Sequence, residues 1–231
     1  YLQTSKPGIY ALGDAINHHQ YRHTANYHAS LVWQNAFHDR RVAIDEHAVP
    51  HAVFTHPQVA AAGLTQSEAE QAYDEVLVGT KYYTDVAKGY AMGEEETFFK
   101  VVVENGTGRI LGAHAIGPHA AMLVQQLVYV MHADEGTYLP LARAQTIHPA
   151  LSEVVVGALG NLREQRAAGA VGLPERGDGV ERLRLQRAED QGHEAELRLE
   201  VVRAALGLQR ALFTAQSQQP AEDASTRIFI D

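Results

Sequence analysis

The segment that decides the fold is an apolar run, a turn and a second apolar run: Thr97-Phe98-Phe99-Lys100-Val101-Val102-Val103-Glu104, Asn105-Gly106-Thr107-Gly108 and Arg109-Ile110-Leu111-Gly112-Ala113-His114-Ala115-Ile116. β-Branched and aromatic residues in the first run favour a strand. Asparagine and glycine between the two runs are typical of a tight turn. The sequence therefore predicts an antiparallel hairpin with strands at 97–104 and 109–116.

The residues that follow this hairpin favour helices. Gly117-Pro118 ends the second strand, and an apolar helix is expected at 120–132. Its hydrophobic residues cover much of its circumference, which is typical of a helix buried in a core or at a subunit interface. A short helix is expected at 138–144 and a last one at 151–162.

The residues that precede the hairpin favour shorter elements. Val53 and Phe54 suggest a strand bracketed by prolines, and residues 75–83 alternate as a strand does. A capping box formed by Thr65 and Glu68 begins a helix that runs to about Tyr73. A loop with irregular turns is expected at 85–93. Together these elements predict an α+β domain with a mixed antiparallel sheet flanked by helices.

A second segment, Thr146-Ile147-His148-Pro149-Ala150-Leu151-Ser152-Glu153, carries the candidate chemistry. A histidine titrates near neutral pH, so His148 can both accept and donate a proton. Ser152 is expected to be a helix N-cap, with Glu153 in the first turn, where a carboxylate is favoured. Glu153 is then close enough to hydrogen-bond the imidazole, which selects its tautomer and raises its basicity. The alternative is that the His-Pro pair is only a turn before a helix.

The N-terminal region carries a candidate ligand-binding turn. Residues 8–15 are expected to form a short apolar strand that ends in Gly13-Asp14. Ligands bind at the carboxyl ends of strands in open α/β sheets, where a carboxylate accepts hydrogen bonds from sugar-type hydroxyls. The alternative is a strand-to-helix turn capped by Asp14. A helix is expected at 23–37, and its N-terminus would offer N–H groups and a partial positive charge to an electron-rich ligand.

The composition excludes several classes of function. A formal charge of −9 over 231 residues argues against nucleic acid or an anionic membrane as the main partner. The absence of cysteine excludes disulfides and thiolate chemistry within these residues. No membrane-span run or signal pattern appears, so a reducing, cytoplasmic location is expected. Among thirteen histidines, His19 and His23 have the spacing of a helical metal site, but no carboxylate completes the set nearby and no metal is predicted.

The last part of the chain differs from the rest. Residues 163–231 contain no lysine and combine a linker-like stretch with leucines among arginine and glutamate. This tail is left unassigned, as helical or disordered. It is either a lineage-specific extension or a translation of DNA that is not normally read in this frame. The chain also begins at Tyr1 rather than at methionine, which suggests a fragment.

Four blocks taken together resemble the C-terminal part of the flavin-dependent pyridine nucleotide–disulfide oxidoreductases. In the order of that family, and at about its spacing, they are Gly8–Asp14, Phe54–Thr65, Gly108–His114 and His148–Glu153. The resemblance covers Tyr1 to about Leu162. It implies that residues 1–47 are the end of an FAD-binding domain, that residues 48–162 are the dimerisation domain, and that the protein is a homodimer.

The resemblance also implies roles for single residues. Asp14, preceded by Gly13, matches the aspartate that bonds the ribityl chain of FAD. The segment whose backbone meets the pyrimidine edge of the flavin is matched by Gln20, Tyr21, Arg22 and His23. The family usually has small apolar residues where the tyrosine and arginine stand. His148 and Glu153 match a His–Glu pair in which the histidine of one subunit reaches the redox disulfide of the other and exchanges a proton with a thiol.

The implied activity is FAD-dependent NAD(P)H:disulfide oxidoreduction on a low-molecular-weight thiol disulfide, such as a mycothione-type or glutamylcystine-type substrate. Residues 83–92 and 148–155 favour mycothione reductase, with dihydrolipoamide dehydrogenase as the alternative. The family's Cys-x4-Cys disulfide, first Gly-x-Gly-x-x-Gly motif and nicotinamide domain are not in these residues, so this chain alone is not expected to be active. Two other interpretations remain, a dimerisation module without chemistry and a truncated or mis-framed gene product.

Overall fold

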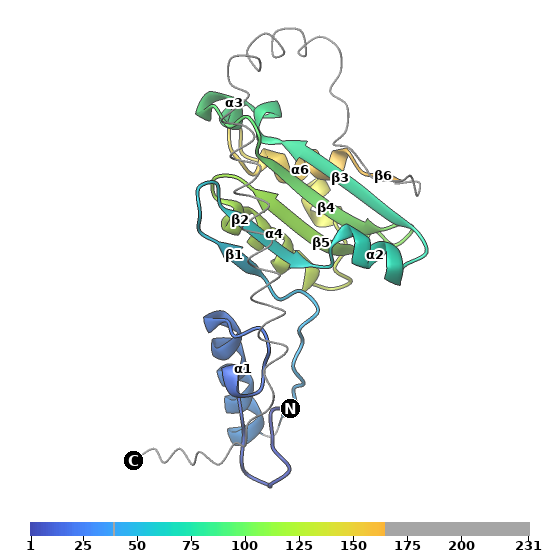
Figure 1. The fold of residues 1–231 in the computed structure, drawn as a ribbon. Coiled ribbons are helices and arrows are strands. Elements are labelled where there is room, and N and C mark those ends of the chain that lie inside the picture. The colour runs from blue at the N-terminus through green and yellow to red at the C-terminus, as the bar shows by residue number, and fades with distance from the viewer. Residues whose placement is uncertain (39, 165–231) are drawn as a thin grey trace. The chain divides into compact units, whose positions relative to one another are not determined.

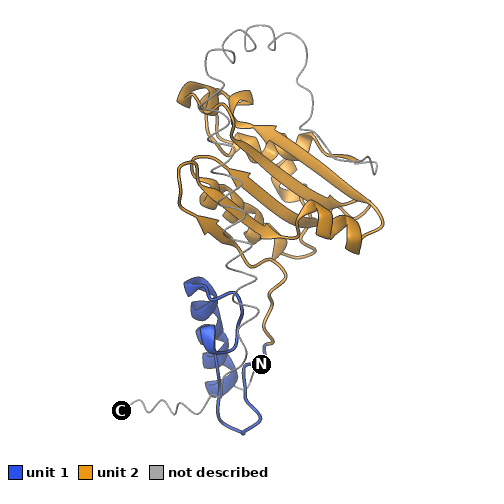
Figure 2. Cartoon of the chain, in the orientation of Figure 1, with its two compact units in different colours: residues 1–42, 170–231 blue, residues 43–169 orange. Residues whose placement is uncertain are grey.

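The computed structural model describes residues 1–38 and 40–164 (Figure 1). The described chain falls into two compact units, one within residues 1–42 and one from residue 43 onward (Figure 2). The expected domain boundary at residues 47/48 stays a prediction. The tail is predicted to be helical or disordered. Its residues 165–231 lie outside the described part of the chain.

The first unit consists of a helix and the turn that packs against it. The turn is η1 (Gly13–Ala15), and the helix is α1 (Arg22–Phe37), which confirms the helix predicted at 23–37. The strand predicted at 8–15 is wrong, because this segment forms only a single bridge, between Gln3 and Tyr10. A strand needs a neighbour along its length for its N–H and C=O groups, and the described residues of this unit provide none.

The second unit is built on an antiparallel sheet. Among the described residues the sheet has six strands in the order β1-β2-β5-β4-β3-β6, and every neighbouring pair is antiparallel. The strands are β1 (His51–Val53), β2 (Val59–Gly63), β3 (Val76–Tyr82), β4 (Phe98–Glu104), β5 (Ile110–Ile116) and β6 (Arg163–Glu164). The predicted hairpin is therefore confirmed as the β4–β5 pair, at the centre of the sheet.

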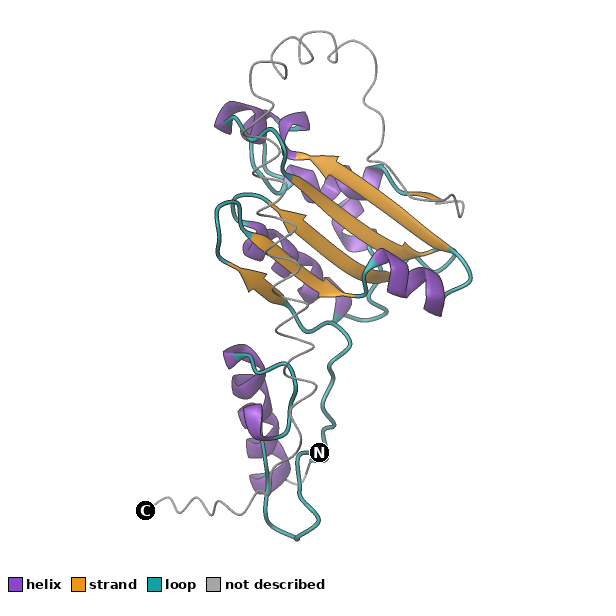
Figure 3. Cartoon of the chain, in the orientation of Figure 1, coloured by secondary structure: helices purple, strands orange, loops and turns teal. Residues whose placement is uncertain are grey.

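Helices complete the α+β architecture that the sequence predicts (Figure 3). They are α2 (Gln66–Ala72), α3 (Ala87–Met92), α4 (Ala120–Met131), α5 (Leu139–Arg143) and α6 (Glu153–Gly160), with the short turn η2 (Tyr83–Asp85) before α3. The helices predicted at 120–132, 138–144 and 151–162 are confirmed to within two residues. None of the described helices combines the length and apolarity that a transmembrane segment requires.

The main core lies between one face of the sheet and two helices. Helix α4 packs on β2 and β5, and α6 packs on β3 and β4. Alternate residues of β4, namely Phe99, Val101 and Val103, are fully buried in this core together with Leu127 of α4 and Val154 of α6. Val102 points to the opposite face, where a smaller cluster lies beside α2. The period-2 pattern of β4 thus assigns its side chains to two different cores.

The capping box predicted at the start of α2 is confirmed. The Thr65 hydroxyl accepts the backbone N–H of Glu68, and the Glu68 carboxylate accepts the backbone N–H of Thr65 at 2.8 Å. Two N–H groups that the helix leaves unpaired are satisfied by this exchange.

Two parts of the fold differ from the prediction. The loop expected at 85–93 is wrong, since η2 and α3 form there and Gly93 ends α3 in the left-handed region, at φ +74°. This short helix depends on Gly89, where a Cβ atom would lie 2.1 Å from the carbonyl oxygen of Tyr83. Strand β2 was not predicted, because Val59-Ala60-Ala61-Ala62-Gly63 lacks the β-branched alternation of a typical strand.

Candidate functional site

The strongest candidate site is the pair formed by His148 and Glu153 at the start of α6. The imidazole Nδ1 of His148 lies 2.8 Å from Oε1 of Glu153. The other carboxylate oxygen, Oε2, accepts the backbone N–H of Ala150 at 3.0 Å. One carboxylate therefore holds both the imidazole ring and the turn between the two residues. The hydrogen bond predicted from the sequence is present, and its catalytic role stays a prediction.

Packing of α6 on the sheet holds this carboxylate in place. Val154 and Val155, directly after Glu153, are fully buried in the main core. On β3, a Cβ atom at Gly79 would lie 2.0 Å from the carbonyl oxygen of Ala158, so the close approach of α6 requires glycine there. The position of the carboxylate thus follows from the core of the second unit.

Ser152 occupies the N-cap position of α6, as predicted, but its hydroxyl does not cap the helix. Ser152 has helical backbone angles, and its side chain makes no capping hydrogen bond. The N–H groups of Val154 and Val155 donate to the carbonyl oxygens of Leu151 and Ser152. The Glu153 carboxylate accepts the N–H of Ala150, a backbone donor just before the helix. The His148–Pro149 peptide bond is cis.

The electrostatics of the pair favour a charged carboxylate and an oriented imidazole. The hydrogen bond from Ala150 and then that from His148 lower the pKa of Glu153. An ionised Glu153 accepts the Nδ1–H of the ring, which leaves Nε2 as the nitrogen that can take up and release a proton. The His148 side chain is 68% exposed and that of Glu153 is 24% exposed, so the histidine is presented at the surface.

The predicted ligand-binding turn is anchored on α1 by its glycine. Gly13 is buried with φ +63°, and its N–H donates to Nδ1 of His28 at 3.1 Å. A Cβ atom at Gly13 would lie 3.2 Å from the Cβ of Ala25, so a larger residue would crowd the helix. Asp14 follows with an exposed side chain. A role in FAD binding stays a prediction for both residues.

The segment from Gln20 to His23 forms the entry into α1. Gln20 has left-handed backbone angles at φ 52°, and Tyr21 is the N-cap residue without a side-chain capping bond. The rings of Tyr21 and His23 stack with centroids 5.1 Å apart, and Arg22 is the first residue of the helix. Because η1 packs against α1, the first unit brings both predicted flavin-binding segments onto one helix.

The helical histidine pair considered for a metal does not form. Helix α1 begins at Arg22, so His19 precedes it and is not one helical turn from His23. The ring of Tyr21 contacts both histidine rings, with centroid distances of 6.0 Å and 5.1 Å. The i,i+4 spacing brings two histidines together only within a helix, and α1 does not include His19.

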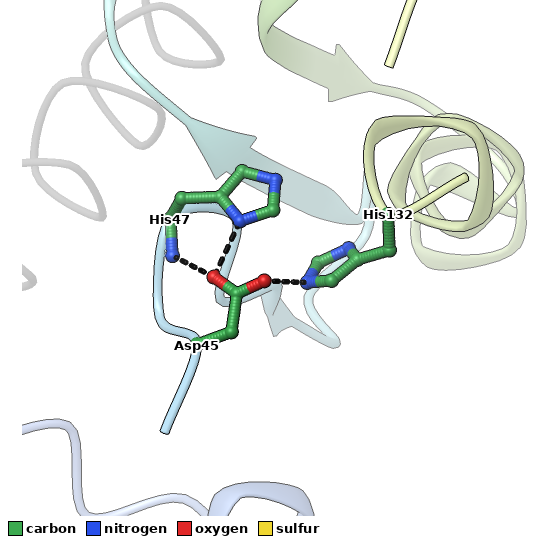
Figure 4. Close-up of side chains that lie close together, drawn as sticks. All are labelled: Asp45, His47 and His132. Atoms are coloured by element: carbon green, nitrogen blue, oxygen red, sulfur yellow. Dashed lines mark hydrogen bonds and ion pairs between the residues drawn. The ribbon is translucent and has the colours of Figure 1, made fainter. Parts of the chain in front are cut away.

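A cluster that the sequence does not predict lies elsewhere in the second unit. Asp45, His47 and His132 lie together, and their potential ligand atoms are all within 4.8 Å of one another (Figure 4). Nδ1 of His47 is 2.5 Å from Oδ1 of Asp45, and Nε2 of His132 is 4.0 Å from Oδ2. The Asp-x-His spacing is visible in the sequence. His132 joins it only because α4 ends beside the segment that leads into β1.

Residues 49–159 match the family described as the pyridine nucleotide-disulphide oxidoreductase dimerisation domain. The second unit has the fold of this domain, and the curated relatives that the chain matches are pyridine nucleotide-disulphide oxidoreductases. The resemblance drawn from the four sequence blocks is thereby confirmed.

Two curated relatives illustrate the range of similarity. Mycothione reductase of Mycobacterium tuberculosis is 41% identical over 169 residues, which are 71% of this chain and 37% of that protein. Dihydrolipoyl dehydrogenase of Chlamydia trachomatis is 33% identical over 153 residues, which are 66% of this chain and 32% of that protein. The chain spans about a third of the length of these relatives.

Solved structures show the same fold. The HOCl-induced flavoprotein disulfide reductase RclA of Escherichia coli aligns with a TM-score of 0.63 at 23% identity, over 69% of this chain and 37% of that chain. LpdA of M. tuberculosis aligns with a TM-score of 0.63 at 23% identity, over 68% and 34% of the two chains. At this identity the likeness concerns the fold alone.

Proposed function

We propose that the complete protein is an FAD-dependent NAD(P)H:disulfide oxidoreductase acting on a low-molecular-weight thiol disulfide. The observation that carries this proposal is the His148–Glu153 pair, in which Nδ1 and Oε1 are 2.8 Å apart. Helix α6, which packs on the sheet through its buried side, orients the carboxylate. The carboxylate orients the ring, and the ring is exposed. A base held by an orienting group is the arrangement that acid–base catalysis needs.

In this proposal His148 and Glu153 have different roles. His148 is the catalytic residue, and its Nε2 takes the proton of an attacking thiol or returns a proton to a leaving thiolate. Glu153 is the positioning residue, which keeps the hydrogen on Nδ1 and stabilises the imidazolium once it forms. Thiol–disulfide exchange proceeds through thiolates, so moving this proton sets the rate of exchange. Because the chain has no cysteine, the sulfur atoms come from the substrate and from outside these residues.

The first unit has groups that suit part of a flavin site. The exposed carboxylate of Asp14 can accept hydrogen bonds from ribityl hydroxyls, and the start of α1 offers backbone N–H groups and a partial positive charge. In the first turn of α1, the hydroxyl of Thr24 is buried without a hydrogen-bond partner among the described residues. FAD, when bound, supplies two-electron transfer between a nicotinamide and a disulfide. Gly13, Asp14 and the segment Gln20–His23 would hold it.

A mycothione-type disulfide is the substrate that we favour. The relative named mycothione reductase is 41% identical to this chain, and the relative named dihydrolipoyl dehydrogenase is 33% identical. The test is NAD(P)H oxidation by the complete protein with mycothione disulfide, with the disulfide of glutamylcysteine and with lipoamide. We expect kcat/KM for one of the small-thiol disulfides to exceed that for lipoamide by about 100-fold or more, since a pocket that hydrogen-bonds one substrate rejects another that lacks those groups. A preference for lipoamide would establish the dehydrogenase alternative.

We also propose that the protein is a homodimer. The match to a dimerisation domain supports this, as do Met122 and Tyr129, large apolar residues that are exposed on α4 one heptad apart. Size-exclusion chromatography with light scattering on this chain should give twice the mass of one chain. Tyr129→Glu should shift the chain towards monomer, whereas Phe37→Glu, at an exposed residue of the first unit, should not. A well-behaved monomer for the unmodified chain would contradict the proposal.

We place the protein in the cytoplasm. The absence of cysteine in these residues suits a reducing compartment, where a disulfide reductase finds reduced nicotinamide and maintains thiols. Fractionation of the producing cells tests this location, with the protein expected in the fraction that holds cytoplasmic enzymes.

A further inference from the structure

We propose that Asp45, His47 and His132 form a binding site for a divalent transition metal, with Zn²⁺ as the occupant. Asp45 and His47 lie in the segment before β1, and His132 directly follows α4 (Figure 4). All three belong to the second unit. The site is separate in sequence from the His148–Glu153 pair and from the predicted flavin-binding residues.

The backbone fixes which nitrogen of His47 is a metal-binding atom. Nε2 of His47 lies 3.2 Å from the carbonyl oxygen of Met131. A carbonyl oxygen can only accept a hydrogen bond, so Nε2 carries the hydrogen. In the neutral ring the lone pair is therefore on Nδ1. This is the atom that faces Oδ1 of Asp45 at 2.5 Å.

His132 is also held by a backbone carbonyl, but through the other ring nitrogen. Nδ1 of His132 lies 2.9 Å from the carbonyl oxygen of Val128, so Nδ1 carries the hydrogen. The lone pair of the neutral ring is then on Nε2, the atom that lies 4.0 Å from Oδ2 of Asp45. Backbone carbonyls that hold the far nitrogen of each ring are the usual outer shell of a histidine-bound metal.

Two lone pairs and a carboxylate therefore converge on one place. Oδ1 of Asp45 also accepts the backbone N–H of His47 at 3.2 Å. Three acceptor atoms that face one another repel unless a cation lies among them. A proton on one imidazole satisfies only one ring, and protons on both would place two cations on rings whose centroids are 4.4 Å apart. A single divalent ion satisfies all three groups at once. The carbonyl end of α4 lies beside the site and favours a cation there.

The donor set points to zinc. Imidazole nitrogen and carboxylate oxygen are ordinary Zn²⁺ ligands, and zinc imposes no geometry through its d-electrons. Two histidines and one carboxylate leave a fourth position open to water. The three side chains are exposed, so small rotations can bring their ligand atoms from the present spread of up to 4.8 Å to the bonding distance of roughly 2.0–2.2 Å.

The test is metal titration of the full chain, without flavin, nicotinamide or substrate. Zn²⁺ binding is followed by calorimetry, and Co²⁺ is used as a second probe because tetrahedral coordination gives visible absorption. We expect one strong site per chain. His132→Gln and Asp45→Asn should each weaken binding about 10-fold or more, since each removes one of three ligands. The control is His56→Gln, at an exposed histidine of the β1–β2 loop.

Circular dichroism of each variant establishes that it is folded, and Asp45→Asn keeps the shape of the side chain if His132→Gln perturbs α4. Binding that is equally strong in His132→Gln and Asp45→Asn would overturn the proposal, because the metal would then lie elsewhere. Absence of a strong site in the unmodified chain would also overturn it and would leave the cluster as a proton-sharing ion pair. Neither result bears on disulfide reduction, which this experiment does not measure.

Discussion

Replacing His148 with glutamine is expected to lower disulfide turnover by the complete protein by a factor of about 10²–10⁴, the range in which a positioned general acid–base contributes. Glutamine can keep a hydrogen bond to Glu153 but cannot carry a proton between thiol and thiolate. The nicotinamide-dependent reduction of the flavin should be unchanged, because it does not need this proton. Stopped-flow absorbance separates the two half-reactions.

His56→Gln is the matched control for this substitution, since His56 is also an exposed histidine that precedes a proline. It should leave both half-reactions unchanged. If His148→Gln turned over disulfide at the rate of the unmodified protein, His148 would have no role in proton transfer. If it slowed both half-reactions equally, the effect would be on structure rather than on chemistry.

Replacing Phe99 with alanine is expected to lower the free energy of unfolding by about 3–5 kcal/mol, the usual cost of removing a buried phenylalanine ring. Phe99 is fully buried in the main core, in the central strand β4. The cost combines lost apolar burial with the cavity left between β4 and the helices α4 and α6. Urea denaturation of the chain, followed by circular dichroism, measures this difference.

Phe54→Ala makes the same chemical change at a phenylalanine that is 77% exposed in the same unit. Its effect on the free energy of unfolding should stay within about 0.5 kcal/mol, because little apolar surface is lost from the core. Equal effects of the two substitutions would mean that Phe99 does not belong to the core that the fold requires.

The sequence predicts the parts of the fold in which local pattern and tertiary environment agree. The β4–β5 hairpin has both strand propensity and a turn signal, and α4 has a sustained helical pattern. Strand β2 is an alanine-rich segment whose backbone pairs with β1 and β5. Pairing with these neighbours, rather than its own composition, makes it a strand. The error at residues 8–15 has the opposite cause, since these residues have the composition of a strand but no neighbouring strand in the described unit.

The two candidate sites also differ in how far a local sequence pattern determines them. His148 and Glu153 are five positions apart, and a turn followed by a helix is enough to bring them together, so local reasoning finds the pair. Ser152 stands at the predicted N-cap position but makes no side-chain capping bond, because the N–H groups of Val154 and Val155 donate to the carbonyl oxygens of Leu151 and Ser152. The cluster of Asp45, His47 and His132 depends on where α4 ends in space. No pattern within a short window of sequence contains that information.

The central proposal is that the complete protein, of which these residues form one part, is a flavin-dependent disulfide reductase. The most direct test is to sequence the coding DNA upstream of Tyr1. We expect the reading frame to continue upstream and to encode a Cys-x4-Cys pair and a Gly-x-Gly-x-x-Gly motif, which would supply the redox disulfide that His148 serves. An upstream reading frame without these motifs would contradict the proposed function and would favour a dimerisation module without chemistry or a truncated gene product.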